Sequence, residues 1–452
     1  MGSSCSSRSS VHPVQRPIIG VIGGGIGGCC SALQLAKTGN YTVFLLEKNS
    51  QLMSESSNVT PGRMGLGFHY ADTNTALFYL RSTLEFTKKY GQFRQELARD
   101  QKHSLRRGRY FIMKNSGFSV QNILQTYQAL KEEYTRLVRD NGCYELFGDP
   151  EEFYKILAPR EYEQDVCADK VELGLETAEE LLDWPKFKES IINQLEENKE
   201  KGLLKIKTSA EVTAIDTCSF GGYTLKTHNE LMVVDALVNA SWYNIGKFNK
   251  QLGITDVRKR RNRLKAIATI SLPPKMLEAP SMFFCMGAYA MFSNKGNGVG
   301  MVTYAPETNI AVSSSQVIEP EFQRLLFGQS VEEKSSKGKA ILEGVCQFIP
   351  GLKDAEIRKV EFGVIQTFMD EEPTSSSFKI GNLDFLHDPK FGEINKRDYS
   401  GVEMPTARYV VNACMKLLYC YDNAVQVVQL INKCFMKTNV NKTKEKTKKN
   451  NE

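Results

Sequence analysis

A glycine-rich turn near the start of the chain constrains its fold more than any other segment. Residues 16–48 read RPIIGVIGGGIGGCCSALQLAKTGNYTVFLLEK. The β-branched run IIGVI predicts a buried parallel strand that leads directly into GGGIGG. Gly23, Gly25 and Gly28 fit the spacing G-x-G-x-x-G. In this spacing the first glycine permits the turn, the second admits a pyrophosphate and the third lets a helix pack closely on the strand.

The segments that follow complete a nucleotide-binding unit. GCCSALQLAKTG predicts a helix that ends at Gly39 and points its first N–H groups at the pyrophosphate. The second strand, YTVFLLEK, ends at Glu47, nineteen residues beyond Gly28, where a carboxylate accepts hydrogen bonds from ribose hydroxyls. Together these features indicate a Rossmann-type α/β domain. The unit alone leaves NAD and FAD open, because both cofactors share the ADP half.

Chain length and charge indicate the number of modules and the character of the C-terminal end. A chain of 452 residues is longer than one hydrophobic core usually serves, so we expect two or three packed modules. The longest apolar stretches are too short and too rich in glycine to cross a bilayer. The net charge of +6 is concentrated in the last twenty residues, which hold seven Lys and two Glu. We expect residues 436–452 to form a disordered basic tail that is either solvated or drawn to anionic lipid.

Other polar features exclude several classes of partner. The basic run RKRRNRLK at residues 258–265 lacks the interleaved aromatic residues of a nucleic-acid site, so we predict a solvated loop there and no nucleic-acid partner. The eleven cysteines include no C-x-x-C pair, which argues against a disulfide framework or a metal site. Because no secretory signal precedes the first strand, we expect an intracellular protein, cytoplasmic or attached to the cytoplasmic face of a membrane.

The first seven residues, MGSSCSS, fit an acylation signal. Gly2 is then the acceptor for myristate and Cys5 an acceptor for palmitate. One myristoyl chain gives only marginal membrane affinity, and a second chain or a basic patch makes the attachment stable. The alternative is an unmodified end, and residues 1–15 are expected to be disordered in either case.

The opening unit, followed by SSNVTPGRMGLGFHYAD at residues 56–72, resembles the FAD-dependent oxidoreductases related to D-amino-acid oxidase and to glycine or sarcosine oxidase. The extended fingerprint of that family is matched by Ala32, Leu35, Gly39, Val43 and Glu47. The resemblance implies FAD as the cofactor. The residues that it assigns to cofactor binding are Gly23, Gly25, Gly27, Gly28, Glu47, Lys48, Asn58, Gly62, Arg63, Met64 and Val212.

The same resemblance implies an α/β fold in which a Rossmann-type FAD-binding domain is interleaved with a smaller α+β substrate domain. It extends over residues 16–435. The FAD-binding parts are expected at about 16–100, 165–250 and 375–435, and the substrate domain at about 101–164 and 251–374.

Two segments depart from the family pattern. The strand ELMVVDALVN commonly leads into Ala-x-Gly in the family, whereas here Ser241 and Trp242 follow Ala240. Near the end of the chain, NACMKLL stands where the family has a glycine-rich turn that reaches the flavin C2 carbonyl. Negative charge develops there when flavin is reduced, so this turn either displaces the stabilising donors or supplies the charge of Lys416.

The resemblance implies oxidation of a C–H bond next to an amine or hydroxyl, by hydride transfer to flavin N5. The expected partner is a small molecule: an amino acid, an amine or a 2-hydroxy acid. A flavin-binding regulatory or scaffold protein without turnover is the alternative that the altered turn supports. An NAD(P)-dependent enzyme is a third hypothesis, disfavoured by the flavin-like loop after Glu47.

Four side chains are candidates for the site beyond the nucleotide. His69 either tunes the flavin, contacts substrate, forms a covalent link or is structural. Arg63 faces a phosphate or carboxylate, or forms a surface ion pair. Tyr289 and Tyr304 lie on predicted substrate-domain strands, where they line the pocket or belong to an aromatic core.

Overall fold

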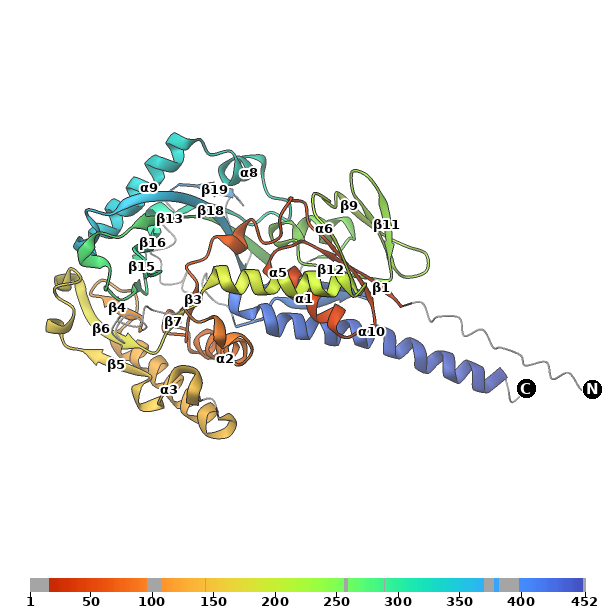
Figure 1. The fold of residues 1–452 in the computed structure, drawn as a ribbon, viewed down its shortest axis with the longest axis horizontal. Coiled ribbons are helices and arrows are strands. Elements are labelled where there is room, and N and C mark those ends of the chain that lie inside the picture. The colour runs from red at the N-terminus through yellow and green to blue at the C-terminus, as the bar shows by residue number, and fades with distance from the viewer. Residues whose placement is uncertain are drawn as a thin grey trace, which may run out of the picture.

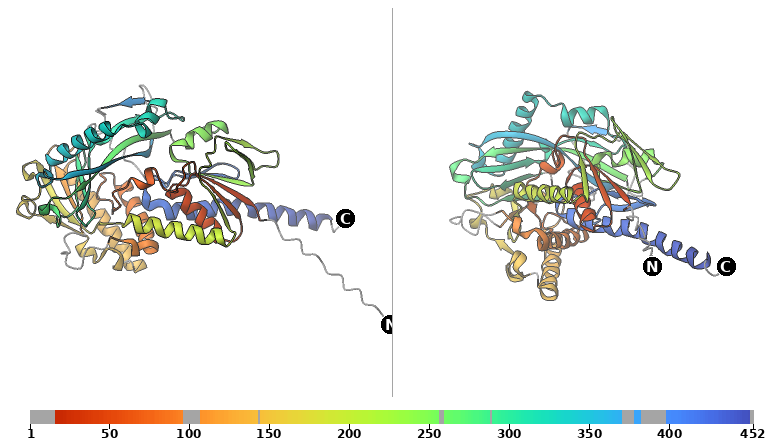
Figure 2. Two further views of the ribbon diagram at one scale, coloured as in Figure 1. Left: turned by 45° about the horizontal axis from the view of Figure 1, so that its top comes forward. Right: turned by 45° about the vertical axis from the view of Figure 1, so that its right-hand side comes forward.

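The computed structural model describes residues 16–95, 107–142, 144–255, 259–287, 289–369, 378–381 and 398–449. Its two large sheets lie toward opposite ends of the long axis (Figures 1 and 2). Among these residues no helix is both long and apolar enough to cross a membrane. The acylation candidates Gly2 and Cys5 lie outside the described residues.

The first large sheet contains the strand that precedes the glycine-rich turn. Across it the strands are β20 (Val402–Thr406), β21 (Tyr409–Asn412), β12 (Ala236–Asn239), β1 (Ile18–Ile22), β2 (Thr42–Leu46) and β8 (Leu204–Lys207). Every neighbouring pair is parallel except β20 with β21. The apolar sequences of β1 and β12 fit strands that are covered on both faces.

Different elements cover the two faces of this sheet. The helical side contains α1 (Ile26–Lys37), α2 (Thr73–Tyr90), α5 (Trp184–Glu200) and α10 (Cys420–Lys449). The other side contains α6 (Ile245–Gln251) and a small antiparallel sheet of β9 (Ala214–Thr217), β10 (Tyr223–Lys226) and β11 (Leu231–Val234). The sheet is therefore the middle layer of a three-layer α/β unit.

The second large sheet has ten strands. Its order is β19 (Phe378–Ile380), β17 (Asn309–Ser313), β13 (Lys259–Ser271), β16 (Val299–Tyr304), β15 (Ala290–Asn294), β14 (Met282–Cys285), β4 (Arg109–Met113), β6 (Val171–Thr177) and β5 (Tyr154–Leu157), with β18 (Glu356–Met369) paired to β13. Besides short 3-10 helices, the described residues also form α3 (Val120–Asn141), α4 (Tyr144–Phe147), α7 (Ala305–Thr308), α8 (Pro320–Phe327), α9 (Val331–Cys346) and the two-stranded ribbon of β3 (Arg63–Met64) and β7 (Glu180–Leu181). The mixed α/β class that the sequence predicts is confirmed.

Local signals set the ends of several helices. The Asp72 carboxylate accepts a hydrogen bond from the Thr75 N–H at the start of α2. Ser330 and Glu333 form a capping box at the start of α9. Gly142 ends α3 with φ of 62°, a left-handed conformation that glycine adopts without strain.

Three sequence-based expectations differ from the structure. Residues 259–265 form the first half of β13 rather than a solvated loop, because they pair with β18 along their whole length. Strand β6 belongs to the ten-stranded sheet, although we expected the FAD-binding part to resume at residue 165; its antiparallel pairing with β4 and β5 places it there. Helix α10 continues to Lys449 rather than ending before a disordered tail, since no Gly or Pro interrupts it.

The close packing of α1 on β1 depends on Gly23 and Gly28. Gly23 has φ of 100°, and a Cβ on it would lie 2.5 Å from the Ala240 carbonyl oxygen. A Cβ on Gly28 would lie 1.8 Å from the Gly23 carbonyl oxygen. Backbone atoms cannot yield as a flexible side chain does, so this contact fixes where α1 begins.

We expect Gly28→Ala to lower the free energy of unfolding by about 3 kcal/mol, because the new methyl group overlaps backbone. Gly39→Ala is the matched control, since Gly39 has φ of 69° and a Cβ on it would meet nothing within 4 Å. That substitution should cost about 1 kcal/mol from backbone strain alone. Urea unfolding of both variants tests the contact, and equal losses would contradict it.

Candidate functional site

A cavity of about 380 Å³ lies between the carboxyl ends of the parallel strands and the ten-stranded sheet. Ile22, Leu46 and Ala240 line it where β1, β2 and β12 end. Residues of β13 and β18 line it on the opposite side. Ligands of open parallel sheets bind at this edge, so the position itself indicates a binding site.

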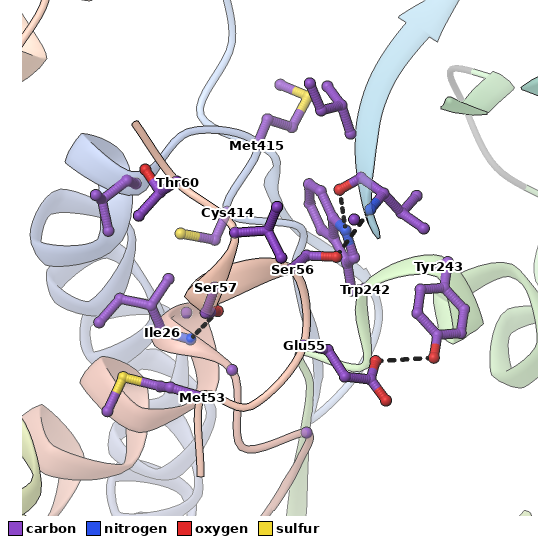
Figure 3. Close-up of a pocket in the computed structure, with 18 of the residues that line it drawn as sticks. Ile26, Met53, Glu55, Ser56, Ser57, Thr60, Trp242, Tyr243, Cys414 and Met415 are labelled. Carbon is purple, nitrogen blue, oxygen red and sulfur yellow. Dashed lines mark hydrogen bonds between the residues drawn. The ribbon is translucent and has the colours of Figure 1, made fainter. Parts of the chain in front are cut away.

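The glycine-rich turn forms the narrow part of the wall. The Ile26 N–H, in the first turn of α1, donates to Ser57 Oγ at 3.0 Å (Figure 3). A Cβ on Gly25 would contact only Ser57 Oγ, at 3.3 Å, so the backbone here is open to a ligand. A Cβ on Gly27 would lie 2.6 Å from the Cβ of Cys414. Gly27 therefore lets the turn at residues 412–416 approach the start of α1.

Glu47 supports the turn from the end of β2. Its carboxylate accepts hydrogen bonds from the N–H of Gly24 at 2.6 Å and from the N–H and side-chain amide of Asn49, both at 2.8 Å. Burial raises the pKa of Glu47, and the hydrogen bonds from Asn49 and Gly24 oppose that rise. Glu47 also lines the cavity, where the remaining lone pairs of its carboxylate can accept ribose hydroxyls.

Lys48 and Val212 also line the cavity. The Lys48 ammonium lies 2.7 Å from the Glu55 carboxylate and also donates to the Tyr243 hydroxyl. The loop after β2 is thereby tied to the segment after β12. Val212 lies between β8 and β9 and is 5% exposed.

Arg63 belongs to a buried ion pair rather than a surface one. Its guanidinium lies 3.1 Å from the Glu179 carboxylate, and the Tyr110 hydroxyl hydrogen-bonds to both groups. The Phe283 ring centroid is 3.9 Å from the guanidinium carbon. Burial raises the pKa of Glu179, while the charges of Arg63 and Lys416 oppose that rise. These contacts hold Arg63 in the cavity wall.

The turn at residues 412–416 brings a cation to the cavity. Cys414 has φ of 42°, and its N–H donates to Asn412 Oδ1 at 3.1 Å. The Lys416 ammonium lies 5.3 Å from the ring centroid of Tyr79 and 5.6 Å from that of Tyr70, within the range of cation–π attraction. Of the two outcomes that we considered for this turn, a nearby Lys charge is the one that the side-chain placement favours.

His69 also lines the cavity, beside Tyr70. The two rings meet edge to face with centroids 5.5 Å apart. The Tyr70 hydroxyl is buried and has no hydrogen-bond partner among the residues that the structure describes. A polar atom in this state indicates a wall that a polar ligand can complete.

The wall contains some of the predicted residues and not others. Gly23, Gly25, Gly27, Glu47, Lys48, Arg63, His69 and Val212 all line it. Gly28, Asn58, Gly62 and Met64 are not among its lining residues. Asn58 accepts from Lys188 at 3.3 Å, and Met64 is fully buried in the β3–β7 ribbon. Tyr289 and Tyr304 are half-buried, pack on Phe348 at the edge of the core and are not among the lining residues.

The sequence analysis missed two cations on β13. Arg263 and Lys265 line the cavity, and Arg263 is 5% exposed with a hydrogen bond of 3.0 Å to the Asn309 side chain. Both residues lie in the basic run that we predicted to be a loop. Alternate spacing at i and i+2, followed directly by the apolar AIATISL, was the signal that pointed to one face of a strand.

The fold and the cavity define an α/β dinucleotide-binding protein with a chamber under a second sheet, lined by apolar as well as charged residues. The family model described as "FAD dependent oxidoreductase" matches residues 19–389. The chain belongs to this family of enzymes, and its cofactor is FAD, which confirms both predictions and excludes the NAD(P) hypothesis. The open Gly25 backbone, the first turn of α1 and Glu47 fit the pyrophosphate and ribose of that cofactor.

Solved structures share this fold at low sequence identity. Glycine oxidase from Geobacillus kaustophilus is 14% identical, with a TM-score of 0.60 over 93% of this chain and 95% of that one. L-proline dehydrogenase from P. horikoshii is 17% identical, with a TM-score of 0.59 over 93% and 94%. FAD-bound L-alpha-glycerophosphate oxidase from Mycoplasma pneumoniae is 14% identical, with a TM-score of 0.60 over 93% and 95%. A search of curated proteins finds no significant match.

Lys295 supports the loop that carries Arg63. Its ammonium donates to the carbonyl oxygens of Pro61 at 3.1 Å and Leu182 at 3.5 Å. Burial lowers the pKa of Lys295 from 10.5 to about 8, and the charge of Asp183 opposes that shift. The folded protein therefore binds this proton more weakly than the unfolded chain does.

This difference predicts a pH dependence of stability. The folded state carries the full penalty below pH 8 and gains up to about 3 kcal/mol as the pH rises to 10.5. Urea unfolding at pH 8 and pH 10 should show this gain in the wild type relative to Lys295→Met. Lys275→Met is the control, since Lys275 is half exposed and pairs only with Asp354 among the described acids. An identical pH dependence in wild type and Lys295→Met would contradict the prediction.

Proposed function

We propose that the enzyme oxidises a C–H bond next to the amine or hydroxyl of a small molecule that carries an acid group. The observation that supports this proposal is the distribution of charge in the cavity wall. Arg263, Lys265 and Lys416 line the part beside β13 and the turn at residues 412–416. An amino acid or a 2-hydroxy acid suits such a chamber better than a simple amine, whose positive charge the three cations repel.

The acidic side chains of the wall lie elsewhere. Among the residues that the structure describes, they are Glu47, Glu55 and Glu211. Glu55 pairs with Lys48, and the N–H of Ala210, next to Glu211, donates to the Glu47 carbonyl at 2.8 Å. All three therefore gather near the end of β2, in the part assigned to the nucleotide. Lys48 is therefore neutralised by Glu55 at this end, whereas Arg263, Lys265 and Lys416 lie on β13 and on the turn at residues 412–416.

The proposed mechanism gives each cation a task. FAD supplies the acceptor for the hydride. Arg263 and Lys265 bind the acid group and thereby orient the neighbouring C–H bond. Lys416 compensates the negative charge that accumulates as electrons enter the site. His69 stays a candidate for contact with the substrate.

Anaerobic addition of pooled amino acids, 2-hydroxy acids and amines to the yellow protein tests this function. Bleaching by an acid pool is the expected result, and splitting that pool identifies the substrate. A spectrum that no pool bleaches would favour the alternative, a flavin-binding regulatory protein without turnover. The altered turn, in which the backbone of Cys414 is left-handed, is the feature that supports this alternative.

Lys265→Met should raise KM for the acid substrate by about tenfold to a hundredfold, because a charged hydrogen bond to the acid group is lost. We expect kcat to change less than about threefold, since binding rather than chemistry is affected. Steady-state kinetics of the variant beside Lys275→Met measures the effect. A fall in kcat with unchanged KM would contradict the recognition role.

Lys416→Met should lower the midpoint potential of the bound flavin by about 30 mV or more, since a nearby cation favours the reduced, more negative form. Potentiometric titration against a reference dye measures the shift. A matched potential in wild type and variant would show that Lys416 does not compensate charge at the flavin.

Two further predictions concern the ends of the chain. Gly2 and Cys5 are acylated, and the basic residues 436–452 contact a membrane.

A further inference from the structure

Trp242 has an unusual backbone for so large a residue. Its φ is 59°, in the left-handed region that side chains other than those of Gly, Asn and Asp rarely adopt. It stands where the family pattern Ala-x-Gly has its glycine, and its side chain lines the cavity. Such a conformation persists only when neighbouring contacts fix it, and it often marks a functional position.

Two hydrogen bonds to one residue of β18 identify the contact that fixes it. Trp242 Nε1–H donates to the Val364 carbonyl oxygen at 2.9 Å, and the Val364 N–H donates to Ser56 Oγ at 2.9 Å (Figure 3). Val364 is thus held at the edge of β18 that faces away from β13, through its C=O by the segment after β12 and through its N–H by the loop after β2. Tyr243 closes the ring, because its hydroxyl donates to the Glu55 carboxylate at 2.9 Å.

Ser56 and Trp242, the two residues that hydrogen-bond to Val364, adjoin the nucleotide part of the cavity. Ser56 precedes Ser57, whose hydroxyl accepts from the first turn of α1. Trp242 follows Ala240 and Ser241, which line the cavity beside Gly23. A ligand that replaces Ser57 Oγ at the Ile26 N–H therefore moves Ser57, and Ser57 is the neighbour of Ser56 in the chain.

Val364 itself adjoins the substrate part of the cavity. In the antiparallel register of β13 and β18, Val364 pairs with Leu264. The residues on either side of Leu264 are Arg263 and Lys265, both of which line the cavity. A shift of Val364 therefore moves both cations relative to the nucleotide.

We propose that Trp242 and Ser56 are positioning residues that couple occupancy of the FAD site to the position of the β13–β18 pair. FAD fixes the loop after β2 and the segment after β12, and these two segments hold Val364 at a set distance. Because coupling between two binding sites is reciprocal, a ligand bound to Arg263 and Lys265 raises the affinity of the protein for FAD. The proposal depends on the cofactor and not on the substrate class.

Hydrogen exchange of the full-length protein with and without FAD tests this coupling. In the wild type, FAD should slow exchange in peptides from residues 46–58 and also in those from residues 356–369. In Trp242→Phe, which keeps a ring but removes the donor, slowing should persist at 46–58. Exchange at 356–369 in the FAD-bound form should become about fivefold faster, the effect of one lost hydrogen bond.

Ser56→Ala removes the other hydrogen bond to Val364 and provides a second, smaller variant. It should give the same pattern, and the double variant should add little, because both contacts act through Val364. Tyr289→Phe is the matched control, since it removes a single hydrogen bond of 2.8 Å to Asn115 outside the cavity, and it should behave as wild type. The proposal is wrong if FAD leaves exchange at 356–369 unchanged in the wild type, or if both variants retain the wild-type slowing there.

Discussion

The contact between the first turn of α1 and the chain that ends β1 is the constraint on which the rest of the site depends. Gly28 packs against the Gly23 carbonyl at a distance that admits no Cβ. This fixes the direction in which α1 begins, and with it the N–H groups and the positive end of the helix dipole that face the cavity. Gly27, in the same helical turn, has no Cβ and so leaves room for Cys414 and for the turn that carries Lys416.

Charge is separated along the cavity that this contact opens. Carboxylates gather at the end of β2, where ribose hydroxyls need acceptors. Lys48 pairs with Glu55 there and Arg63 pairs with Glu179, whereas Arg263, Lys265 and Lys416 line the cavity beside β13 and at the turn of residues 412–416. Family membership accounts for the cofactor, whereas the separation of charge in this chain is what narrows the proposed substrate to an acid. Fold alone supports no such choice, since one fold hosts many substrates.

The parts of the site that could be predicted from sequence are those fixed by local geometry. Gly23, Gly25 and Glu47 belong to one strand–turn–helix–strand unit, so spacing along the chain places them in space. Arg263 and Lys265 could not be placed in this way, because their strand is defined by pairing with β18, about a hundred residues later. The burial of Met64 and Gly62 likewise depends on β7 and Lys295, which are remote in sequence. Strained backbone at Trp242 and Cys414 is visible only in three dimensions.

The most direct measurement of the central claim compares an acid substrate with its uncharged methyl ester or amide in anaerobic stopped-flow reduction of the bound flavin. If the β13 cations recognise the acid group, the ratio of the limiting reduction rate to the apparent dissociation constant should be about a hundredfold higher for the acid. Equal ratios for the two forms, or faster reduction by the ester, would contradict the account.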